Sequence, residues 1–304
     1  DFITRDLHSE IAEVVIGSDV NFNSNMYNIL SSQISGSPSA KEGQYYPREV
    51  PGYLKPLRSN MEARTVLQSL LVQFSNDRIT KNSSFFWERH HDSHIGCALT
   101  LRPNQDSLLI SLDGSGDGES GAIANSNSHG LSYLSRISNL DSLGNLYSSV
   151  TQRYNFKPQH HEGKITGLAA HGQYSGAVDV LLKYVEVNDG IPRIRNIRGL
   201  KGKFIRRAMP SNVSKKFMLS IDDIIDKAET ESHNYSNLAF AVQYVLEQSV
   251  LEIAKYWQSV TNNVNLSLAG GVFANVKLNQ KLAEDLSFES VRVFPNMGDG
   301  GISV

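Results

Sequence analysis

Two histidines at helical spacing are the first residues whose chemistry the sequence suggests. His90 and His94 lie in WERHHDSHIGCALTL, residues 87–101, which we predict to be helical. Residues four positions apart on a helix lie one above the other, so their imidazoles can bind one metal ion, while His91 points elsewhere. Taken alone, such a pair is more often a chance surface feature. The metal-binding interpretation therefore depends on what else the chain supplies.

Two aspartates that follow apolar segments are the next candidates. Asp113 ends the run LLISLD, residues 108–113, and enters the stretch DGSGDGESG, in which the backbone N–H of Gly114 can approach an anion. A hairpin without a ligand is an equal alternative for this stretch. Asp299 lies between glycines in FPNMGDGGIS, after the apolar segment VRVF. By itself such an aspartate is more often a turn residue than a ligand.

A double glycine near the C-terminus suggests a nucleotide-binding turn. The predicted strand VNLSL, residues 264–268, leads through Gly270 and Gly271 into a predicted helix that bears Asn275 and extends to Lys281. A strand, a glycine turn and a helix N-terminus commonly bring backbone N–H groups against a nucleotide. Two glycines alone are weak evidence for such a site.

A charged segment before GLAAHG supplies candidate catalytic side chains. Lys164 can neutralise a phosphate, and Glu162 or His161 can act as a base. An exposed loop that is merely charged is the competing interpretation. The sequence contains no G-x-S-x-G motif, which disfavours serine-hydrolase chemistry.

The elements that must position these residues alternate between strands and helices. Apolar alternation predicts a meander of strands within residues 119–137, and residues 142–154 and 178–187 are predicted to be helical. An earlier helix is predicted to follow Ser59, and a long one spans residues 236–257. Strands that lead into helices indicate an α/β layered fold.

Composition and charge exclude several classes of protein. The 304 residues are 40% hydrophobic and 20% charged, as in ordinary globular proteins, and allow one large domain or two lobes. The net charge of −2 provides no basic face for nucleic acid, and no run of 18 apolar residues is present for a membrane span. Cys97 is the only cysteine, so we expect no disulfide and a reducing, cytoplasmic setting.

Taken together and in order, these segments resemble the carbamoyltransferase family that includes the nodulation-factor and antibiotic O-carbamoyltransferases. The resemblance extends from about residue 87 to residue 304. The matching segments are HHDSHIGCA, LLISLDGSGDGES, SLGNLYSSVTQRYNFKPQHHEGKITGLAAHG, LAGGVFANVKLN and FPNMGDGGIS. The joint pattern is far more specific than any one of its parts.

The resemblance implies a fold and a division of the chain. The expected architecture is an actin-like, sugar-kinase-like (ASKHA) duplicated fold of two α/β lobes around a nucleotide cleft, close to that of the tRNA threonylcarbamoyl transferase. We expect a fragment truncated at both ends, with the remainder of an N-terminal lobe and its HxxxH helix in residues 1–107 and a second lobe in residues 108–304.

The resemblance also implies ligands for the candidate residues. The metal, Fe²⁺ in the first place and Zn²⁺ as the alternative, would be held by His90, His94, Asp113 and Asp299. The GGV segment would contact the adenosine of the nucleotide through Gly270, Gly271 and Asn275.

The activity implied by the resemblance is O-carbamoyl transfer. A carbamoyl group would pass from carbamoyl-adenylate to a hydroxyl of a small-molecule acceptor, and a YrdC-like domain, expected beyond this chain, would make the adenylate from carbamoyl phosphate and ATP. The alternatives are a sugar-kinase-like phosphotransferase, a relative of the tRNA threonylcarbamoyl transferase, and a non-catalytic binding module. A kinase holds Mg²⁺ mainly through oxygen ligands and does not account for the histidine pair.

Overall fold

The chain divides into two compact units, residues 1–88 and residues 89–304, which are described separately. The computed structural model describes residues 11–16, 68–69, 72–73, 79–102, 105–195 and 211–300. In the first unit, β1 (Ile11–Ile16) pairs in parallel with β2 (Ile79–Trp87). The helix predicted after Ser59 falls largely outside the described residues, although positions 68–69 and 72–73 are helical.

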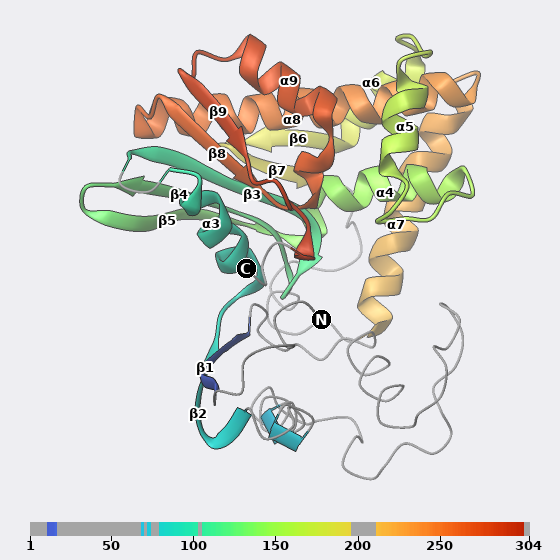
Figure 1. Ribbon diagram of the computed structural model, residues 1–304. Coiled ribbons are helices and arrows are strands. Elements are labelled where there is room, and N and C mark those ends of the chain that lie inside the picture. The colour runs from blue at the N-terminus through green and yellow to red at the C-terminus, as the bar shows by residue number, and fades with distance from the viewer. Residues whose placement is uncertain are drawn as a thin grey trace. The chain divides into compact units, whose positions relative to one another are not determined.

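The second unit is built on a mixed five-stranded sheet (Figure 1). Its strands lie in the order β5-β4-β3-β8-β9, with antiparallel pairing between β3, β4 and β5 and parallel pairing between β3, β8 and β9. The bounds are β3 (Ser107–Gly116), β4 (Glu119–Asn127), β5 (Gly130–Ser138), β8 (Asn265–Ala269) and β9 (Ser290–Val293). The mixed α/β class and the predicted meander are thus confirmed.

Helices cover the sheet, and the unit also contains a separate two-stranded antiparallel ribbon. The helices are α3 (His90–Thr100), α4 (Leu143–Arg153), α5 (Glu162–Ala169), α6 (Gly176–Tyr184), α7 (Ser211–Thr230), α8 (Tyr235–Thr261) and α9 (Val276–Asp285). Single 3₁₀ turns are η2 (Asn139–Asp141) and η3 (Gly271–Ala274), and the antiparallel ribbon joins β6 (Val185–Asn188) to β7 (Ile191–Ile194). None of the helices among the described residues combines the length and apolar character needed to span a bilayer.

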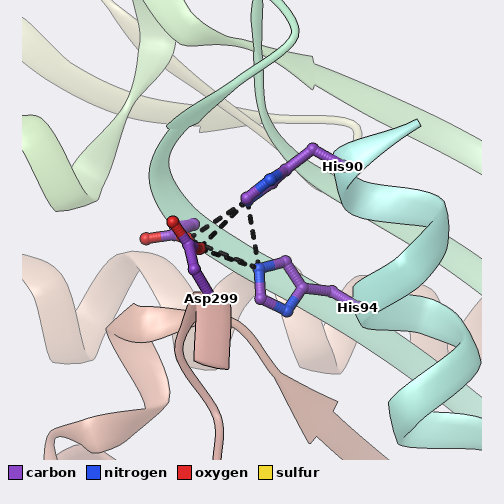
Figure 2. Close-up of side chains that lie close together, drawn as sticks. His90, His94 and Asp299 are labelled. Atoms are coloured by element: carbon purple, nitrogen blue, oxygen red, sulfur yellow. Dashed lines mark hydrogen bonds and ion pairs between the residues drawn. The ribbon is translucent and has the colours of Figure 1, made fainter. Parts of the chain in front are cut away.

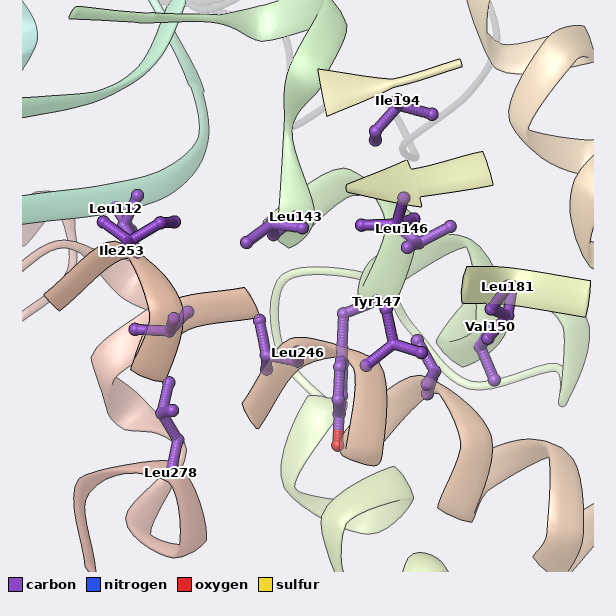
Figure 3. Close-up of a cluster of buried hydrophobic side chains, with 14 of the residues drawn as sticks. Leu112, Leu143, Leu146, Tyr147, Val150, Leu181, Ile194, Leu246, Ile253 and Leu278 are labelled. Carbon is purple, nitrogen blue, oxygen red and sulfur yellow. The ribbon is translucent and has the colours of Figure 1, made fainter. Parts of the chain in front are cut away.

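Alternation along β3 assigns its two faces to different helices. Leu108, Ile110 and Leu112 belong to the large core formed with α4 to α9, part of which Figure 3 shows. Leu109 belongs instead to a smaller core that includes Ile95 of α3. Because successive side chains of a strand point to opposite faces, the sheet separates α3 from the large core. Burial of each such aliphatic side chain contributes about 1.5–3 kcal/mol, less the entropy of ordering it.

The HxxxH helix belongs to the second unit. The boundary between the two compact units lies between Glu88 and Arg89, just before this helix. The reason is packing, since Ile95 and Ala98 of α3 are completely buried against the sheet in the company of Leu109.

Two local predictions need correction. The predicted helix of residues 178–187 ends at Tyr184, after which Val185 begins the ribbon strand β6. The helix expected directly after the double glycine begins only at Val276, because η3 intervenes and Asn275 caps α9 by accepting the N–H of Leu278 at 3.1 Å. A short polar side chain favours this capping position over the helix interior.

Candidate metal centre and adjoining cavity

Four side chains from three distant segments converge at the end of α3 nearest the sheet hairpin. Nε2 of His94 lies 3.1 Å from Nε2 of His90, and both nitrogens approach Oδ2 of Asp113, at 3.4 and 3.5 Å respectively. Oδ1 of Asp299 lies 3.4 Å from the His90 nitrogen and 3.7 Å from that of His94 (Figure 2). One ligand atom from each of the four residues lies within 4.8 Å of every other.

These separations fit the edges of a metal coordination shell. Bonds of about 2.1 Å place neighbouring ligand atoms about 3.0 Å apart in an octahedron and about 3.4 Å apart in a tetrahedron. The five distances of 3.1 to 3.7 Å lie within a few tenths of an ångström of one or the other value. Two imidazoles and two carboxylates form a mixed nitrogen and oxygen shell, which suits Fe²⁺ or Zn²⁺ better than Mg²⁺.

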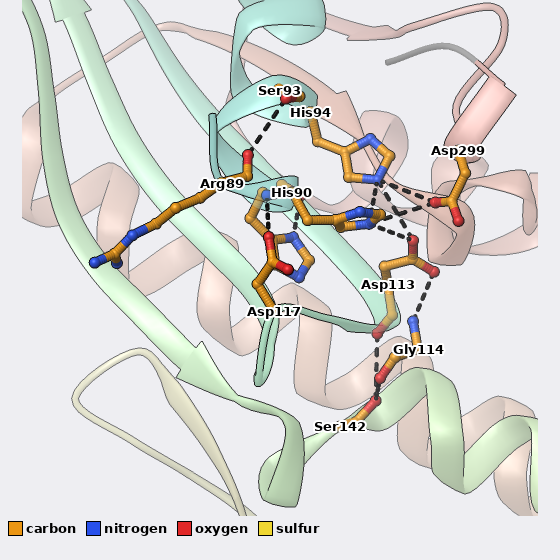
Figure 4. Close-up of polar contacts among 11 residues, drawn as sticks. Arg89, His90, Ser93, His94, Asp113, Gly114, Asp117, Ser142 and Asp299 are labelled. Carbon is orange, nitrogen blue, oxygen red and sulfur yellow. Dashed lines mark hydrogen bonds and ion pairs between the residues drawn. The ribbon is translucent and has the colours of Figure 1, made fainter. Parts of the chain in front are cut away.

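The start of α3 is fixed by the hairpin that joins β3 to β4. The backbone N–H of His90 donates to Oδ2 of Asp117 at 2.8 Å (Figure 4). Asp117 and Gly118 both have positive φ, which is the conformation of a two-residue hairpin turn. Gly116 leaves room for the histidine ring, since a Cβ there would lie 2.2 Å from its Cγ and Cδ2. The hairpin thus positions the first histidine directly.

Asp113 lies within β3 rather than in the turn where we expected it. The strand continues to Gly116, and its register with β4 shifts between Leu112 and Gly116, as in a β-bulge, which can re-aim a side chain. Oδ1 of Asp113 accepts the N–H of Gly114 at 2.6 Å, and the Ser142 hydroxyl donates to the backbone carbonyls of both residues, at 3.2 and 2.7 Å. One carboxylate oxygen is thereby held in place, and the other faces the histidines.

Asp299 reaches the cluster from the segment that follows β9. Its side chain is 72% exposed, whereas that of His94 is 1% exposed, so the cluster is buried on one side and open on the other. The N–H of Gly270 donates to the carbonyl of Met297 at 2.8 Å, two residues before the aspartate. The double glycine therefore ties this segment to the end of β8.

The cluster alters the proton affinity of its members. Burial opposes a charge on His94, but the hydrogen bonds that its ring donates to Asp113 and Asp299 outweigh this effect and raise the pKa of His94 above 6.5. Burial likewise opposes a charge on Asp113, yet hydrogen bonds from His90 and His94 and the Gly114 N–H hold the pKa of this carboxyl well below its usual range. The two carboxylates therefore stabilise a proton on the His94 imidazole.

His91 does not join this cluster. Its ring is completely buried, and Nδ1 lies 2.9 Å from the hydroxyl of Ser111 on β3. Burial, followed by the neighbouring charges of His90 and His94, lowers the pKa of His91 to about 3, so the ring is neutral. The side chain points away from the ligand atoms, as the helical spacing indicated.

A cavity of about 460 Å³ adjoins the cluster. It is lined by both aspartates of the cluster, by glycines, and by polar and apolar side chains, among them the carboxylate of Glu162. Its lining residues are Asp113, Gly114, Ser115, Gly144, Asn145, Tyr147, Ser148, Gln159, His160, Glu162, Gly163, Thr166, Leu246, Gly271, Val272, Ala274, Asn275, Met297, Gly298 and Asp299.

Of the residues predicted to bind a nucleotide, three line this cavity. They are Gly114, Gly271 and Asn275. Gly270 lies beside β3 instead, with φ of +98°, and a Cβ there would lie 2.2 Å from the carbonyl oxygen of Leu112. Its lack of a side chain permits close strand packing, and its N–H is already bonded to Met297.

The three predicted catalytic residues have different positions. Glu162 lines the cavity, and its Oε1 accepts hydrogen bonds from the Ser148 hydroxyl at 2.8 Å and the N–H of Gln159 at 2.6 Å. His161 and Lys164 are outside the lining and pack on Phe156. The Lys164 ammonium lies 4.7 Å from the centre of that ring, and Nδ1 of His161 accepts the N–H of Lys157 at 3.1 Å.

Sequence analysis missed several residues that build the site. Asp117 and Gly116 position His90, and Tyr147, Ser148 and Thr166 line the cavity. The Asp-Gly pair at residues 117 and 118 is a hairpin signal that could have placed the turn correctly. The hydroxyl residues have no local signal, because helical spacing alone does not show which face borders a cavity.

A comparison with known protein families identifies the family of this chain. The sequence profile described as "Carbamoyltransferase N-terminus" matches residues 32–304, which is most of the chain. The chain belongs to the carbamoyltransferase family. The resemblance in the sequence segments is thereby confirmed.

Three relatives illustrate how similar other proteins are to this chain in sequence. An uncharacterized protein of Methanocaldococcus jannaschii is 32% identical over 232 residues, which cover 76% of this chain and 41% of the relative. The nodulation protein NolNO of Sinorhizobium fredii is 28% identical, with 80% and 34% covered, and NolO of Bradyrhizobium diazoefficiens is 26% identical, with 71% and 36% covered. This carbamoyltransferase chain therefore spans well under half the length of these relatives.

A comparison with solved structures gives a distant match. The crystal structure of T. kodakarensis HypF matches with a TM-score of 0.37 and 16% identity, covering 78% of this chain and 37% of that one.

We predict that the four clustered side chains share about one divalent ion per chain. Elemental analysis of the purified protein should find the ion in the wild type and little of it in His90→Ala and Asp299→Ala, because each variant removes a ligand. His91→Asn is the matched control, since its amide can keep the hydrogen bond to Ser111, and it should retain the ion. Equal metal content in all four proteins would contradict the assignment.

The raised pKa of His94 predicts a pH dependence of metal binding. A bound metal must expel the proton from this imidazole, so affinity should begin to fall above pH 6.5 and drop by about tenfold per unit below the pKa of His94. Competition between the protein and a chelator for Zn²⁺, measured from about pH 6 to pH 8, tests this. A constant affinity over that range would show that no imidazole proton competes with the ion.

Proposed function

We propose that this carbamoyltransferase chain forms the site at which a carbamoyl group passes from carbamoyl-adenylate to a hydroxyl of a small acceptor. One observation carries the proposal. Asp113 and Asp299 belong both to the candidate metal cluster and to the lining of the cavity. A ligand in the cavity would therefore lie within reach of an ion held by the cluster.

The cavity suits an adenine nucleotide in size and in lining. Its volume of about 460 Å³ falls within the range of roughly 300–1,000 Å³ typical of small-molecule sites. Gly114, Gly144, Gly271 and Gly298 expose backbone along it, and Leu246 and Val272 supply apolar surface for a base. Backbone N–H groups with an adjoining apolar wall favour a ligand that has both an anionic and a flat apolar part.

The reaction proposed for the site is acyl transfer. The acceptor oxygen bonds to the carbamoyl carbon, the bond between that carbon and the phosphate oxygen breaks, and AMP leaves with the electron pair. A divalent ion in the cluster would supply Lewis-acid polarisation of the carbamoyl or phosphate oxygens. The hydroxyl proton must pass to a base, for which we propose Glu162, because its carboxylate lines the cavity and both of its hydrogen bonds end on Oε1.

Neighbouring side chains hold this carboxylate in place. Ser148 of α4 and the backbone of Gln159 both donate to Oε1, so Glu162 has one fixed orientation at the start of α5. Oε2 has no hydrogen-bond donor among the described residues and can accept a hydroxyl proton or hydrogen-bond to a sugar. His161 and Lys164, which pack on Phe156, have no comparable position.

The remaining parts of the proposal concern the whole protein. Carbamoyl-adenylate would be made from carbamoyl phosphate and ATP at a YrdC-like domain, and the two-lobed actin-like, sugar-kinase-like architecture would enclose the nucleotide. Two relatives, NolNO and NolO, are nodulation proteins, and the acceptor that we propose is a hydroxyl-bearing molecule of nodulation-factor biosynthesis or a related pathway.

We predict that the metal-loaded chain releases AMP from carbamoyl-adenylate when a hydroxyl acceptor or water is present. Chromatographic measurement of AMP should show release by the wild type. His94→Ala removes a metal ligand and should lower the rate of AMP release by at least about 100-fold. Glu162→Gln should retain the metal but also release AMP more slowly. The neutral variant His171→Gln, on an exposed turn, is the control. Equal release by all of these proteins would reflect spontaneous hydrolysis and contradict the proposal.

Two glycines of α5 provide a steric test of the cavity. Gly163 lines it, whereas Gly167 lies one turn further along the same helix, and a Cβ at either position meets no atom within 4 Å. Gly163→Leu should therefore fill the cavity without disturbing the fold and weaken AMP binding, measured by calorimetry, by at least about tenfold. Gly167→Leu should leave it unchanged. Equal affinities in both variants would place the nucleotide elsewhere.

A further inference from the structure

One side-chain amide in the wall of the cavity has no partner within the part of the chain that the structure describes. Asn145 of α4 is half-buried and lines the cavity, and neither its Oδ1 nor its Nδ2 is hydrogen-bonded to a described residue. Its backbone, by contrast, is fully engaged, since the N–H donates to the hydroxyl of Ser142 and the carbonyl accepts the hydroxyl of Ser149. Because polar groups inside proteins are normally paired, this amide is available to a ligand.

The other two amides in the lining are either paired or exposed. The side chain of Asn275 is hydrogen-bonded to Gln243 and Tyr147. Gln159 is exposed to solvent. Among the described residues, Asn145 is therefore the lining amide that is both half-buried and unpaired.

The first turn of α4 holds Asn145 close to the candidate metal ligand Asp113. The Ser142 hydroxyl accepts the N–H of Asn145 at 3.0 Å and donates to the carbonyls of Asp113 and Gly114, so it ties the helix to β3. A Cβ on Gly144 would lie 2.8 Å from the carbonyl oxygen of Asp113, which shows how closely helix and strand pack. Oδ1 of Asn145 lies 3.2 Å from the point at which a Cβ on Gly114 would stand. The unpaired amide is thus beside the peptide that carries the Asp113 carboxylate.

A carbamoyl group is chemically matched to this amide. In the proposed function, the acyl end of the adenylate lies on the Asp113 side of the cavity, next to the candidate metal cluster. A carbamoyl group has an amino group with two N–H donors, and an amide oxygen such as Oδ1 of Asn145 can accept from it. An acetyl group has a methyl group in the same place, which would leave that oxygen without a donor.

We propose that Asn145 binds the amino group of the carbamoyl group through Oδ1 and thereby makes the site selective for carbamoyl-adenylate over other acyl-adenylates. The inference rests on the proposed function, because it requires an acyl-adenylate in the cavity. Asn145 holds the acyl group and takes no part in bond making or proton transfer. Its contribution should therefore appear as a difference in affinity between a carbamoyl ligand and an acetyl ligand.

Two stable analogues of an acyl-adenylate measure this difference without a reaction. They are adenosine sulfamates whose nitrogen carries either a carbamoyl or an acetyl group, so they differ only in the amino group. Calorimetric titration of the zinc-loaded full chain gives the ratio of their dissociation constants for the wild type, Asn145→Leu and Asn145→Asp. Leucine has nearly the shape of asparagine without its polar atoms. Aspartate keeps an acceptor, and the charge that it adds acts on both anionic ligands alike.

The matched control is Gln152→Leu, which removes an amide from an exposed position further along α4. Melting temperature and zinc content are recorded for every protein. If Asn145 serves only the structure of the helix, its replacement should weaken both ligands equally and leave the ratio unchanged. The ratio therefore separates ligand recognition from stability.

We expect the wild type and Gln152→Leu to bind the carbamoyl sulfamate about tenfold more tightly than the acetyl sulfamate. The ratio should fall below about twofold in Asn145→Leu and stay at about fivefold or more in Asn145→Asp. A wild-type ratio near one, or the same ratio in Asn145→Leu as in the wild type, overturns the inference, while binding of both ligands leaves the proposed function standing. A wild type that binds neither ligand overturns both. If Asn145→Leu melts below the assay temperature, Asn145→Ala replaces it.

Discussion

Parallel pairing between β3 and β8 is the constraint on which the site depends. Leu108 to Ser111 align with Leu266 to Ala269, although about 158 positions separate the partners in sequence. The same register continues beyond the paired residues. It places Gly270 next to the backbone of Leu112 and Gly271 next to the carboxylate of Asp113. A shift of one residue would turn Asp113 away from α3, because strand side chains alternate between faces.

The same register explains why metal ligands and cavity share one edge of the sheet. Odd-numbered positions of β3 face α3, so Ser111 contacts His91 and Asp113 approaches the histidine pair. The side chains at even-numbered positions of β3 (Leu108, Ile110 and Leu112) are buried in the large core. There they pack with the helices that contribute residues to the lining of the cavity. The sheet therefore has a candidate metal cluster against one face and supports a ligand cavity beside it, with Asp113 common to both.

The site balances two unfavourable arrangements. Clustered carboxylates repel one another and the buried imidazole of His94 loses hydration, but the hydrogen bonds from His94 to Asp113 and Asp299 offset this cost and raise the pKa of His94. A divalent cation would compensate it more fully. Behind the cavity, polar groups such as Tyr147, Gln243 and Glu247 are buried at comparable cost, and mutual hydrogen bonds offset that cost and fix their orientation. In both regions, hydrogen bonds between buried polar groups fix the positions of the side chains.

Local patterns determined much of this protein. The spacing of His90 and His94, the meander and the long helix α8 follow from short-range rules of helix and strand periodicity, and the joint order of the segments indicated the family. Only the tertiary structure decided that Asp113 lies where the register between β3 and β4 shifts, that Gly270 serves strand packing, and that Gln243 is buried against Tyr147 and Asn275, which line the cavity. These features depend on contacts between segments far apart in the chain, and hydrophobic periodicity records which face of an element is buried but not which partner it meets.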